Sequence, residues 1–270
     1  MAILFVKTAT ELFIFKFKKH YGLHNVFFLP KFAGSDKIKA GRNSVDFLDR
    51  TKKLLSKAEM DRLSHANICV FGCGGVGGYT VEMLTRSGVG SLTVVDFDKV
   101  DVTNINRQII ATTKTVGRKK VDVISERCKE INPEIKINAI DARFDEQTKN
   151  DFNIEQFDFV VDAIDDVKNK LLLILLAKEK NVKIISAMGA GNKIEMPNFK
   201  ICDIFKTEND GLAKKMRKLL KENGIKNLTV CCSNSKSLPL KEVGSIAYYP
   251  AIAGCTIACY VTSEIIKGEK

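Results

Sequence analysis

The segment from residue 67 to residue 108 constrains the fold of this chain more than any other. A β-branched stretch leads into the glycine loop Gly72-Cys73-Gly74-Gly75-Val76-Gly77, which is followed by a helical stretch and a second strand. In such a loop Gly72 permits a tight turn, Gly74 lets the backbone approach a phosphate, and Gly77 lets the helix pack closely on the strand. The helix then points free N–H groups at an anion. The segment therefore predicts a nucleotide-binding site.

Polar residues follow the second strand of this segment. Asp96 lies 19 residues after Gly77, which suits a carboxylate that accepts hydrogen bonds from ribose hydroxyls. With the glycine loop alone, a dinucleotide-dependent dehydrogenase would be the default interpretation. The chain continues, however, through Asp98 into the cluster Asn104-Ile105-Asn106-Arg107-Gln108. A dehydrogenase usually needs no such cluster there, so we expect a ligand of higher charge than a nicotinamide cofactor.

Strand and helix patterns alternate along most of the chain. We expect strands at 67–71, 92–95, 135–140, 157–161 and 182–186, a hairpin at 192–204, and helices at 51–66, 77–87, 115–132, 144–152, 171–177, 212–222 and 249–266. The first of these helices is expected to bury Leu54, Leu55, Ala58 and Leu63. This order predicts an α/β fold, a doubly wound, mainly parallel Rossmann-like sheet with helices on both faces. Ligands bind at the carboxyl ends of such strands.

Charge is unevenly distributed along the 270 residues. The formal net charge is +11, and residues 1–44 hold eight Lys/Arg against Glu11 and Asp36. We expect residues 1–44 to be a basic, poorly ordered extension or the product of an upstream start that is little translated, with a transit peptide or an interfacial anchor as less favoured alternatives. Residues 45–270 are expected to form a single domain. Its mild positive charge is compatible with RNA or nucleotide phosphate.

Cysteine usage and hydropathy indicate the compartment. The spacing of the eight cysteines does not resemble a small disulfide scaffold, so we expect a reducing cytoplasm. The pairs Cys231-Cys232 and Cys255-x-x-x-Cys259 also lack the spacing of a tetrahedral zinc site. No run reaches the roughly 18 apolar residues of a membrane span, so a membrane location is not expected.

Five charged or polar residues could together hold a nucleoside triphosphate. Asp96 would bind the ribose, Asn106, Arg107 and Lys120 the phosphates, and Asp165 would reach a Mg²⁺ that bridges phosphate oxygens. Each residue alone has an ordinary alternative, because a single Arg or Lys is usually solvated and a strand-end Asp often caps a helix. Their joint placement along one edge of the expected sheet favours the site.

These motifs resemble the ubiquitin-activating-enzyme-like adenylyltransferases of the ThiF type over residues 45–268. The resemblance rests on the glycine loop, Asp96-x-Asp98-x-Val100, the 104–108 cluster, Val116-Gly117-x-x-Lys120 and Asp162-x-x-Asp165. It implies ATP binding by Gly72, Gly74, Gly75, Gly77, Asp96, Asp98, Asn104, Asn106, Arg107, Gln108 and Lys120, with Asp165 associated with Mg²⁺. It also implies catalytic roles for Arg107, Lys120, Asp165 and Arg50, the last reaching across the two-fold axis of a homodimer.

Within this superfamily the chain most resembles the tRNA threonylcarbamoyladenosine dehydratases. This finer resemblance uses the 104–108 cluster, Ile131-Asn132-Pro133-Glu134, Asp162-Ala163-Ile164-Asp165, the 213–217 helix and Tyr249-Pro250. It implies that ATP adenylates the carboxylate of threonylcarbamoyladenosine in tRNA, releasing pyrophosphate, and that internal attack then gives the cyclic form and AMP.

Two other functions stay open on the sequence. One is activation of a small ubiquitin-like sulfur carrier, with a sulfur-carrier or cysteine-desulfurase partner; the other is a nucleotide-binding regulatory protein without turnover. A basic helix distinguishes the first interpretation, because Lys214, Lys215, Arg217, Lys218 and Lys221 could contact tRNA. A solvated helix face explains the same residues equally well.

Overall fold

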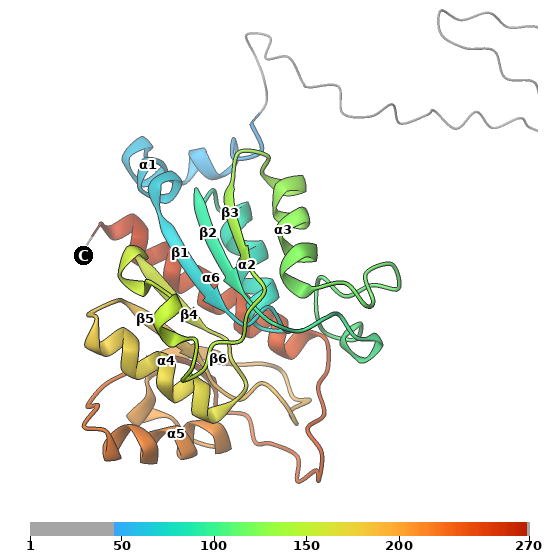
Figure 1. The fold of residues 1–270 in the computed structure, drawn as a ribbon, viewed down its shortest axis with the longest axis vertical. Coiled ribbons are helices and arrows are strands. Elements are labelled where there is room, and N and C mark those ends of the chain that lie inside the picture. Colours follow the sequence, from blue (N-terminus) through green and yellow to red (C-terminus); the bar gives the residue numbers. More distant parts are fainter. Residues whose placement is uncertain (1–45, 269–270) are drawn as a thin grey trace, which may run out of the picture. The chain divides into compact units, whose positions relative to one another are not determined.

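The computed structural model describes residues 46–268, and the expected basic extension at 1–44 lies outside the described residues. A seven-stranded sheet runs through this part of the chain in the order β3-β2-β1-β4-β5-β7-β6 (Figure 1). The strands are β1 Asn67–Phe71, β2 Ser91–Val95, β3 Lys136–Ile140, β4 Phe159–Asp162, β5 Ile184–Ala187, β6 Phe199–Asp203 and β7 Thr229–Ser233. All neighbouring pairs are parallel except β6 and β7. The predicted doubly wound fold class is confirmed.

Helices cover both faces of the sheet because side chains alternate along each strand. The helices are α1 Lys57–His65, α2 Gly77–Arg86, α3 Lys120–Ile131, α4 Val167–Glu179, α5 Gly211–Glu222 and α6 Tyr248–Lys267. On β1, Ile68 and Val70 join one apolar core with α2, α3 and α6, while Cys69 and Phe71 join the second core with α4 and α5. This division of β1 places α2 and α4 on opposite faces of the sheet.

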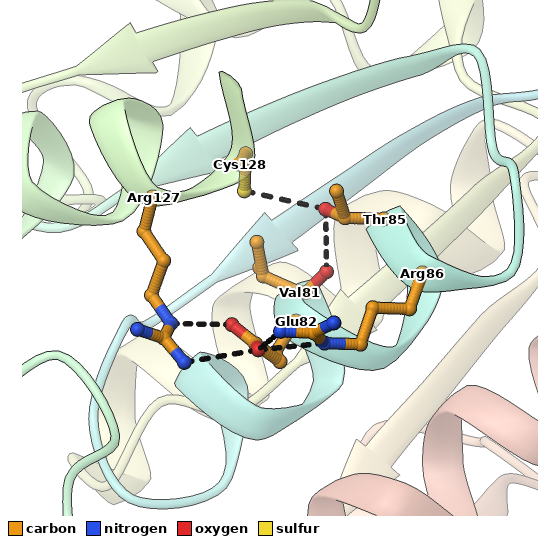
Figure 2. Close-up of polar contacts among 6 residues, drawn as sticks. All are labelled: Val81, Glu82, Thr85, Arg86, Arg127 and Cys128. Carbon is orange, nitrogen blue, oxygen red and sulfur yellow. Dashed lines mark hydrogen bonds and ion pairs between the residues drawn. The ribbon is translucent and has the colours of Figure 1, made fainter. Parts of the chain in front are cut away.

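A buried carboxylate joins α2 to α3 (Figure 2). Glu82 is 3% exposed; its Oε1 lies 2.7 Å from Arg86 Nη2, and its Oε2 accepts a hydrogen bond of 2.5 Å from Arg127 Nε. Nearby, the Thr85 hydroxyl lies 3.2 Å from the Cys128 sulfur. Burial raises the pKa of the Cys128 thiol to about 11, so that thiol stays neutral at ordinary pH. The contacts fix α3 beside the helix that starts at the glycine loop.

Helix α6 crosses α2 at a very short distance. A Cβ on Gly254 would lie 2.5 Å from the carbonyl oxygen of Val76 and 2.8 Å from Tyr79 Cβ, so only glycine allows this approach. By length and composition α6 could also cross a membrane, with a mean hydropathy of 1.2 over its best window. Of that window, 39% is buried in the fold, and α6 packs closely against α2 through Gly254. The predicted final helix on the sheet is therefore present.

The helix predicted at 144–152 is wrong. The segment contains only a 3-10 turn, η3 Lys149–Asp151, because Asp145 and Thr148 satisfy nearby backbone groups with their side chains. Phe144 and Phe152 pack edge-on against Phe71, with ring centroids 5.1 and 5.5 Å away. Their apolar spacing reflects this aromatic cluster and not a helix period.

The hairpin predicted at 192–204 is also wrong. β6 pairs instead with β7, a strand the sequence did not reveal, and α5 lies between the two in the chain. The pairing is antiparallel, as in a hairpin, but the partner is supplied from more than twenty residues further on.

The helix predicted at 51–66 is split in two. It consists of the 3-10 turn η1 Thr51–Lys53 and then α1, which begins at a capping box between Ser56 and Glu59. Leu63 is fully buried as expected, whereas Leu54 lies in the break and is 85% exposed.

Candidate active site

Two glycines of the loop are required by packing within the protein. Gly72 has a φ of +93°, and a Cβ there would lie 2.6 Å from the carbonyl oxygen of Ala163. A Cβ on Gly77 would lie only 1.8 Å from the carbonyl oxygen of Gly72. The loop therefore packs directly on itself and on the turn that follows β4.

Gly74 differs because the protein leaves space beside it. A Cβ there would meet only Gln108 Nε2, at 3.8 Å. Within the described residues, the backbone N–H groups of Gly74, Gly75, Val76 and Gly77 have no acceptor, and no side chain caps α2. A row of free N–H groups at a helix N-terminus is the geometry that binds phosphate.

Gln108 supplies a second unpaired group at this place. Its side chain is 6% exposed, and its Oε1 has no hydrogen-bond partner among the described residues. A buried amide oxygen without a partner is costly, and a bound molecule with a donor would relieve that cost. The open space at Gly74 and the unpaired Gln108 oxygen together fit a nucleotide.

Asp96 ties the end of β2 to the glycine loop. Its Oδ2 accepts a 2.6 Å hydrogen bond from Cys73 N, and its Oδ1 accepts one of 2.8 Å from Asp98 N. Each oxygen keeps a further lone pair, so both can also accept from ribose hydroxyls. Burial raises the pKa of Asp96 above its usual range, although the charge of Lys120 opposes the shift.

Lys120 reaches the same edge from the start of α3. Its side chain is 7% exposed and its Nζ lies 2.7 Å from Asp98 Oδ2. Backbone bonding brings the two together as well, because Lys120 N donates to the Asp98 carbonyl at 3.0 Å. The ammonium group is thus held next to Asp96 and the loop.

The 104–108 cluster folds into a turn over the loop. Arg107 Cγ would lie 3.7 Å from a Cβ on Gly75, and its Nη1 donates to Asn106 Oδ1 at 3.0 Å. Asn106 Nδ2 donates to the Ser245 carbonyl at 3.0 Å, which links the turn to the segment before α6. Asn104 accepts from Asp101 N and shapes the turn itself. Arg107 therefore lies beside the free N–H groups.

Asp165 lies on the turn between β4 and α4. The preceding Ala163 and Ile164 pack against Gly72, and Asp166 caps α4 by accepting from Asn169 N at 2.8 Å. Asp165 is exposed. The described residues contain no group of three or more His, Cys, Asp or Glu that could hold a metal. A lone carboxylate such as that of Asp165 fits Mg²⁺, because this ion is often held by one carboxylate together with substrate phosphates and water.

Arg50 is not brought to this site within the chain. It is exposed and stands just ahead of η1, and nearby Leu48 packs against Gly88, which precedes β2. The site lies at the opposite, carboxyl end of the parallel strands. Any contact of Arg50 with a nucleotide would have to be made in a second subunit.

Some basic side chains of α5 already have partners among the described residues, and others do not. Arg217 donates to the carbonyl and the hydroxyl of Thr207, and Lys218 lies 3.9 Å from Glu222. Lys221 lies 5.8 Å from the Phe205 ring centroid. Lys214 and Lys215 are exposed, and no ion pair engages them in the described part of the chain. The guanidinium of Arg217 is therefore engaged in hydrogen bonds within the protein.

Sequence reasoning missed one charged residue near the site. Lys170 is fully buried on α4 and pairs with Asp162 at the end of β4. The only sequence signal was a lysine at the start of a strongly apolar helix, and it did not reveal a partner on a strand.

The chain matches the ThiF family over residues 48–267. It is 35% identical over 238 residues to the tRNA threonylcarbamoyladenosine dehydratase of Bacillus subtilis, covering 81% of this chain and 94% of that protein. It is 42% identical over 171 residues to the enzyme of that name from Haemophilus influenzae, covering 63% of this chain and 66% of the relative. A crystal structure of the Escherichia coli tRNA N6-threonylcarbamoyladenosine dehydratase with ATP has a TM-score of 0.78 and 30% identity, covering 81% of this chain and 93% of that one.

Proposed function

Because the chain belongs to the ThiF family, we propose that it is an ATP-dependent tRNA threonylcarbamoyladenosine dehydratase. It adenylates the side-chain carboxylate of the modified nucleoside and closes that side chain into a ring, with release of pyrophosphate and AMP. The observation that carries the proposal is the likeness to the Bacillus subtilis dehydratase, which extends over nearly the whole of that protein. The likeness to the solved Escherichia coli enzyme with ATP bound supports it.

The residues around the glycine loop supply the chemistry of the first step. The substrate carboxylate attacks the α-phosphorus of ATP, and pyrophosphate leaves. Two anions must approach each other, so the free N–H groups of residues 74–77, Arg107 and Lys120 lower the barrier by neutralising phosphate charge. Asp96 holds the ribose, and Asn106 and Gln108 complete the phosphate and nucleotide contacts.

The second step needs position more than a protein nucleophile. A nucleophilic atom of the adenylated side chain attacks its own acyl carbon, and AMP leaves with the carboxyl oxygen that was activated. Intramolecular attack of this kind gains a high effective molarity once the chain is held in the right geometry. Burial keeps Cys73 and Cys231 neutral by raising the pKa of both thiols, so neither is suited to covalent catalysis.

We assign Mg²⁺ to Asp165 as part of the proposal. When bound there, the ion would neutralise charge on the phosphate oxygens. A single exposed carboxylate suits it, since the remaining ligands would come from ATP and water.

A homodimer is the second structural part of the proposal. Arg50 lies at the far end of the strands from the nucleotide of its own subunit, so it would act in the partner's site across a two-fold axis. Residues 45–270 are then one adenylyltransferase domain of each subunit.

For tRNA we propose the exposed face of α5, chiefly Lys214 and Lys215, with Lys218 and Lys221 beside them and Arg217 as a structural support. Phosphate contacts of this kind position RNA without reading its sequence. A sulfur-carrier or cysteine-desulfurase partner stays a prediction from the superfamily. A reducing, cytoplasmic location is proposed from the cysteines, all eight of which lie in the described part of the chain and are free.

The proposal is tested by following conversion of ATP to AMP with and without bulk tRNA from cells that make threonylcarbamoyladenosine. We expect AMP formation to require tRNA, and tRNA that lacks the modification to be inert. The Asp165→Ala variant should lose turnover, whereas Asp158→Ala, at the opposite end of β4, should retain it. AMP formation without tRNA would contradict the proposal.

A further inference from the structure

A fully buried ionic cluster lies beneath the turn that carries Asp165. Lys170 Nζ is 2.9 Å from Asp162 Oδ2 and donates to Ser186 Oγ at 3.2 Å. The Ser186 hydroxyl donates to the same carboxylate oxygen at 2.5 Å. All three residues are 0% exposed, and they come from α4, β4 and β5. The cluster therefore joins three elements at the carboxyl end of the sheet, on the face opposite α2.

Stability alone does not account for such a cluster. Burial of two charges costs so much solvation that apolar side chains of similar volume are often as stable or more stable. Elsewhere on the same face the core is built from ordinary apolar side chains, including Val160, Leu173 and Ile174. A charge pair at this position indicates that the structure around it requires the Asp162 carboxylate to be held in one place.

The carboxylate of Asp162 fixes the following turn. Its second oxygen, Oδ1, accepts a 3.1 Å hydrogen bond from Ile164 N. Between them, Ala163 N donates to the Phe71 carbonyl at 2.8 Å, and Ala163 packs against both Gly72 and Gly77. One oxygen of Asp162 thus shapes the turn whose Ala163 packs on the glycine loop, while the other oxygen is held by Lys170 and Ser186.

We infer that Lys170 is a positioning residue: through Asp162 it sets the turn at residues 163–165, and so the place of Asp165 relative to the ATP phosphates. The inference rests on the proposed function, because it takes Asp165 as the carboxylate that meets Mg²⁺·ATP. Lys170 itself touches neither ATP nor metal. Groups that hold a metal-binding carboxylate from behind typically change metal affinity when they are replaced.

The test compares binding of a fluorescent ATP analogue in EDTA with binding over a series of Mg²⁺ concentrations. In Lys170→Met, the Mg²⁺ concentration that half-saturates binding should rise about tenfold or more, as for other residues behind a metal ligand. Affinity in EDTA should change far less, because the N–H groups of residues 74–77 are untouched. Lys178→Met, near the other end of α4, removes a lysine that donates to Asn227 Oδ1 at 2.9 Å; it is the matched control and should behave as wild type.

Two further variants separate positioning from general destabilisation. In Asp162→Asn/Lys170→Met both charges are removed, while the amide oxygen can still accept from Ile164 N, so the Mg²⁺ requirement should return most of the way to that of wild type. Ser186→Ala removes one hydrogen bond without a charge and should raise the Mg²⁺ requirement in the same direction. Should Lys170→Met fail to fold, these two variants carry the test.

The inference is overturned if Lys170→Met melts at lower temperature but keeps the Mg²⁺ requirement of wild type, since the pair would then be structural only. It is equally overturned if the double variant shows the full defect. Failure of the proposed function would look different: wild-type protein would bind Mg²⁺·ATP yet leave threonylcarbamoyladenosine in tRNA unchanged.

Discussion

Lys120 Nζ lies 2.7 Å from Asp98 Oδ2, so two side chains that both belong to the predicted ATP site are paired with each other. The pair is unequal, because the lysine is almost buried and the aspartate is about half exposed. Asp98 can therefore turn to solvent at little cost when a phosphate arrives, while Lys120 stays beside Asp96 and the glycine loop. The arrangement holds a cation in place before the nucleotide binds.

Lys120→Met should weaken ATP binding much more than it weakens the fold. Loss of a charge-assisted phosphate contact is worth roughly 1.5–3 kcal/mol, or about a tenfold to hundredfold loss of affinity. The partly exposed ion pair contributes about 1 kcal/mol or less to stability. Calorimetric titration with ATP and thermal melts measure the two effects. Asp98→Asn removes the charge of the paired carboxylate and keeps the lysine, and an equal loss of affinity in that variant would show that the pair, not the lysine alone, binds ATP.

Two alanine substitutions in the glycine loop should affect different properties: Gly77→Ala should lower stability, and Gly74→Ala should lower ATP affinity. Gly77→Ala places a Cβ 1.8 Å from the Gly72 carbonyl oxygen and should cost roughly 3 kcal/mol of stability, the upper end for overpacking. Gly74→Ala meets only Gln108, so stability should change by about 0.5 kcal/mol at most. ATP affinity should nevertheless fall about tenfold, because the methyl group occupies the phosphate position.

A control for these substitutions lies on α5. A Cβ on Gly211 meets nothing within 4 Å, so Gly211→Ala should leave ATP binding unchanged and stabilise the helix slightly. Unaltered ATP binding by Gly74→Ala would refute the assignment of the loop to phosphate.

ATP binding should weaken as pH falls, starting at a pH above the usual range for an aspartate. Burial raises the pKa of Asp96, and the protonated carboxyl cannot accept from both ribose hydroxyls. Stability should respond in the opposite sense. The folded protein binds this proton more tightly than the unfolded chain, so the Asp96 contribution to stability grows as pH falls through the raised pKa. ATP titrations across that range test the effect on binding and denaturant unfolding tests the effect on stability, with Asp96→Asn as control for both; identical pH profiles of ATP binding in the two proteins would contradict the ribose role.

The sequence predicted the elements that depend on local pattern. Residues 67–71 match β1, and the predicted strand at 92–95 differs from β2 by one residue, because buried parallel strands appear as continuous β-branched runs. Turn chemistry at Asp145 and the distant partner of β6 were not predictable from neighbouring residues. Both errors arise where side-chain hydrogen bonds or non-local pairing decide the structure.

In the candidate site, too, some residues could be predicted from local sequence pattern and others could not. Gly74, Asp96 and Arg107 stand out by motif and spacing, and the structure brings them to one edge of the sheet. The Lys170–Asp162 pair does not stand out, because its partners lie on different elements and Lys170 falls at the start of an apolar helix. Three-dimensional contact, and not residue type, reveals it.

Glu82→Gln should destabilise the protein without changing ATP affinity. The buried carboxylate accepts from both Arg86 and Arg127, and removal of its charge weakens two charge-assisted hydrogen bonds (Figure 2). We expect a loss of roughly 1–3 kcal/mol, from denaturant unfolding, with an unchanged dissociation constant for ATP. Glu126→Gln, whose partner Arg118 is exposed, should cost about 1 kcal/mol or less. A large change in ATP affinity in Glu82→Gln would show that the α2–α3 contact also shapes the site.

The most direct test of the proposed function is mass spectrometry of nucleosides after incubation with ATP, Mg²⁺ and tRNA that carries threonylcarbamoyladenosine. The account predicts that threonylcarbamoyladenosine loses one water per nucleoside, with one AMP and one pyrophosphate formed for each. Unchanged threonylcarbamoyladenosine, with ATP–pyrophosphate exchange appearing only when a diglycine-ended sulfur-carrier protein is added, would contradict it.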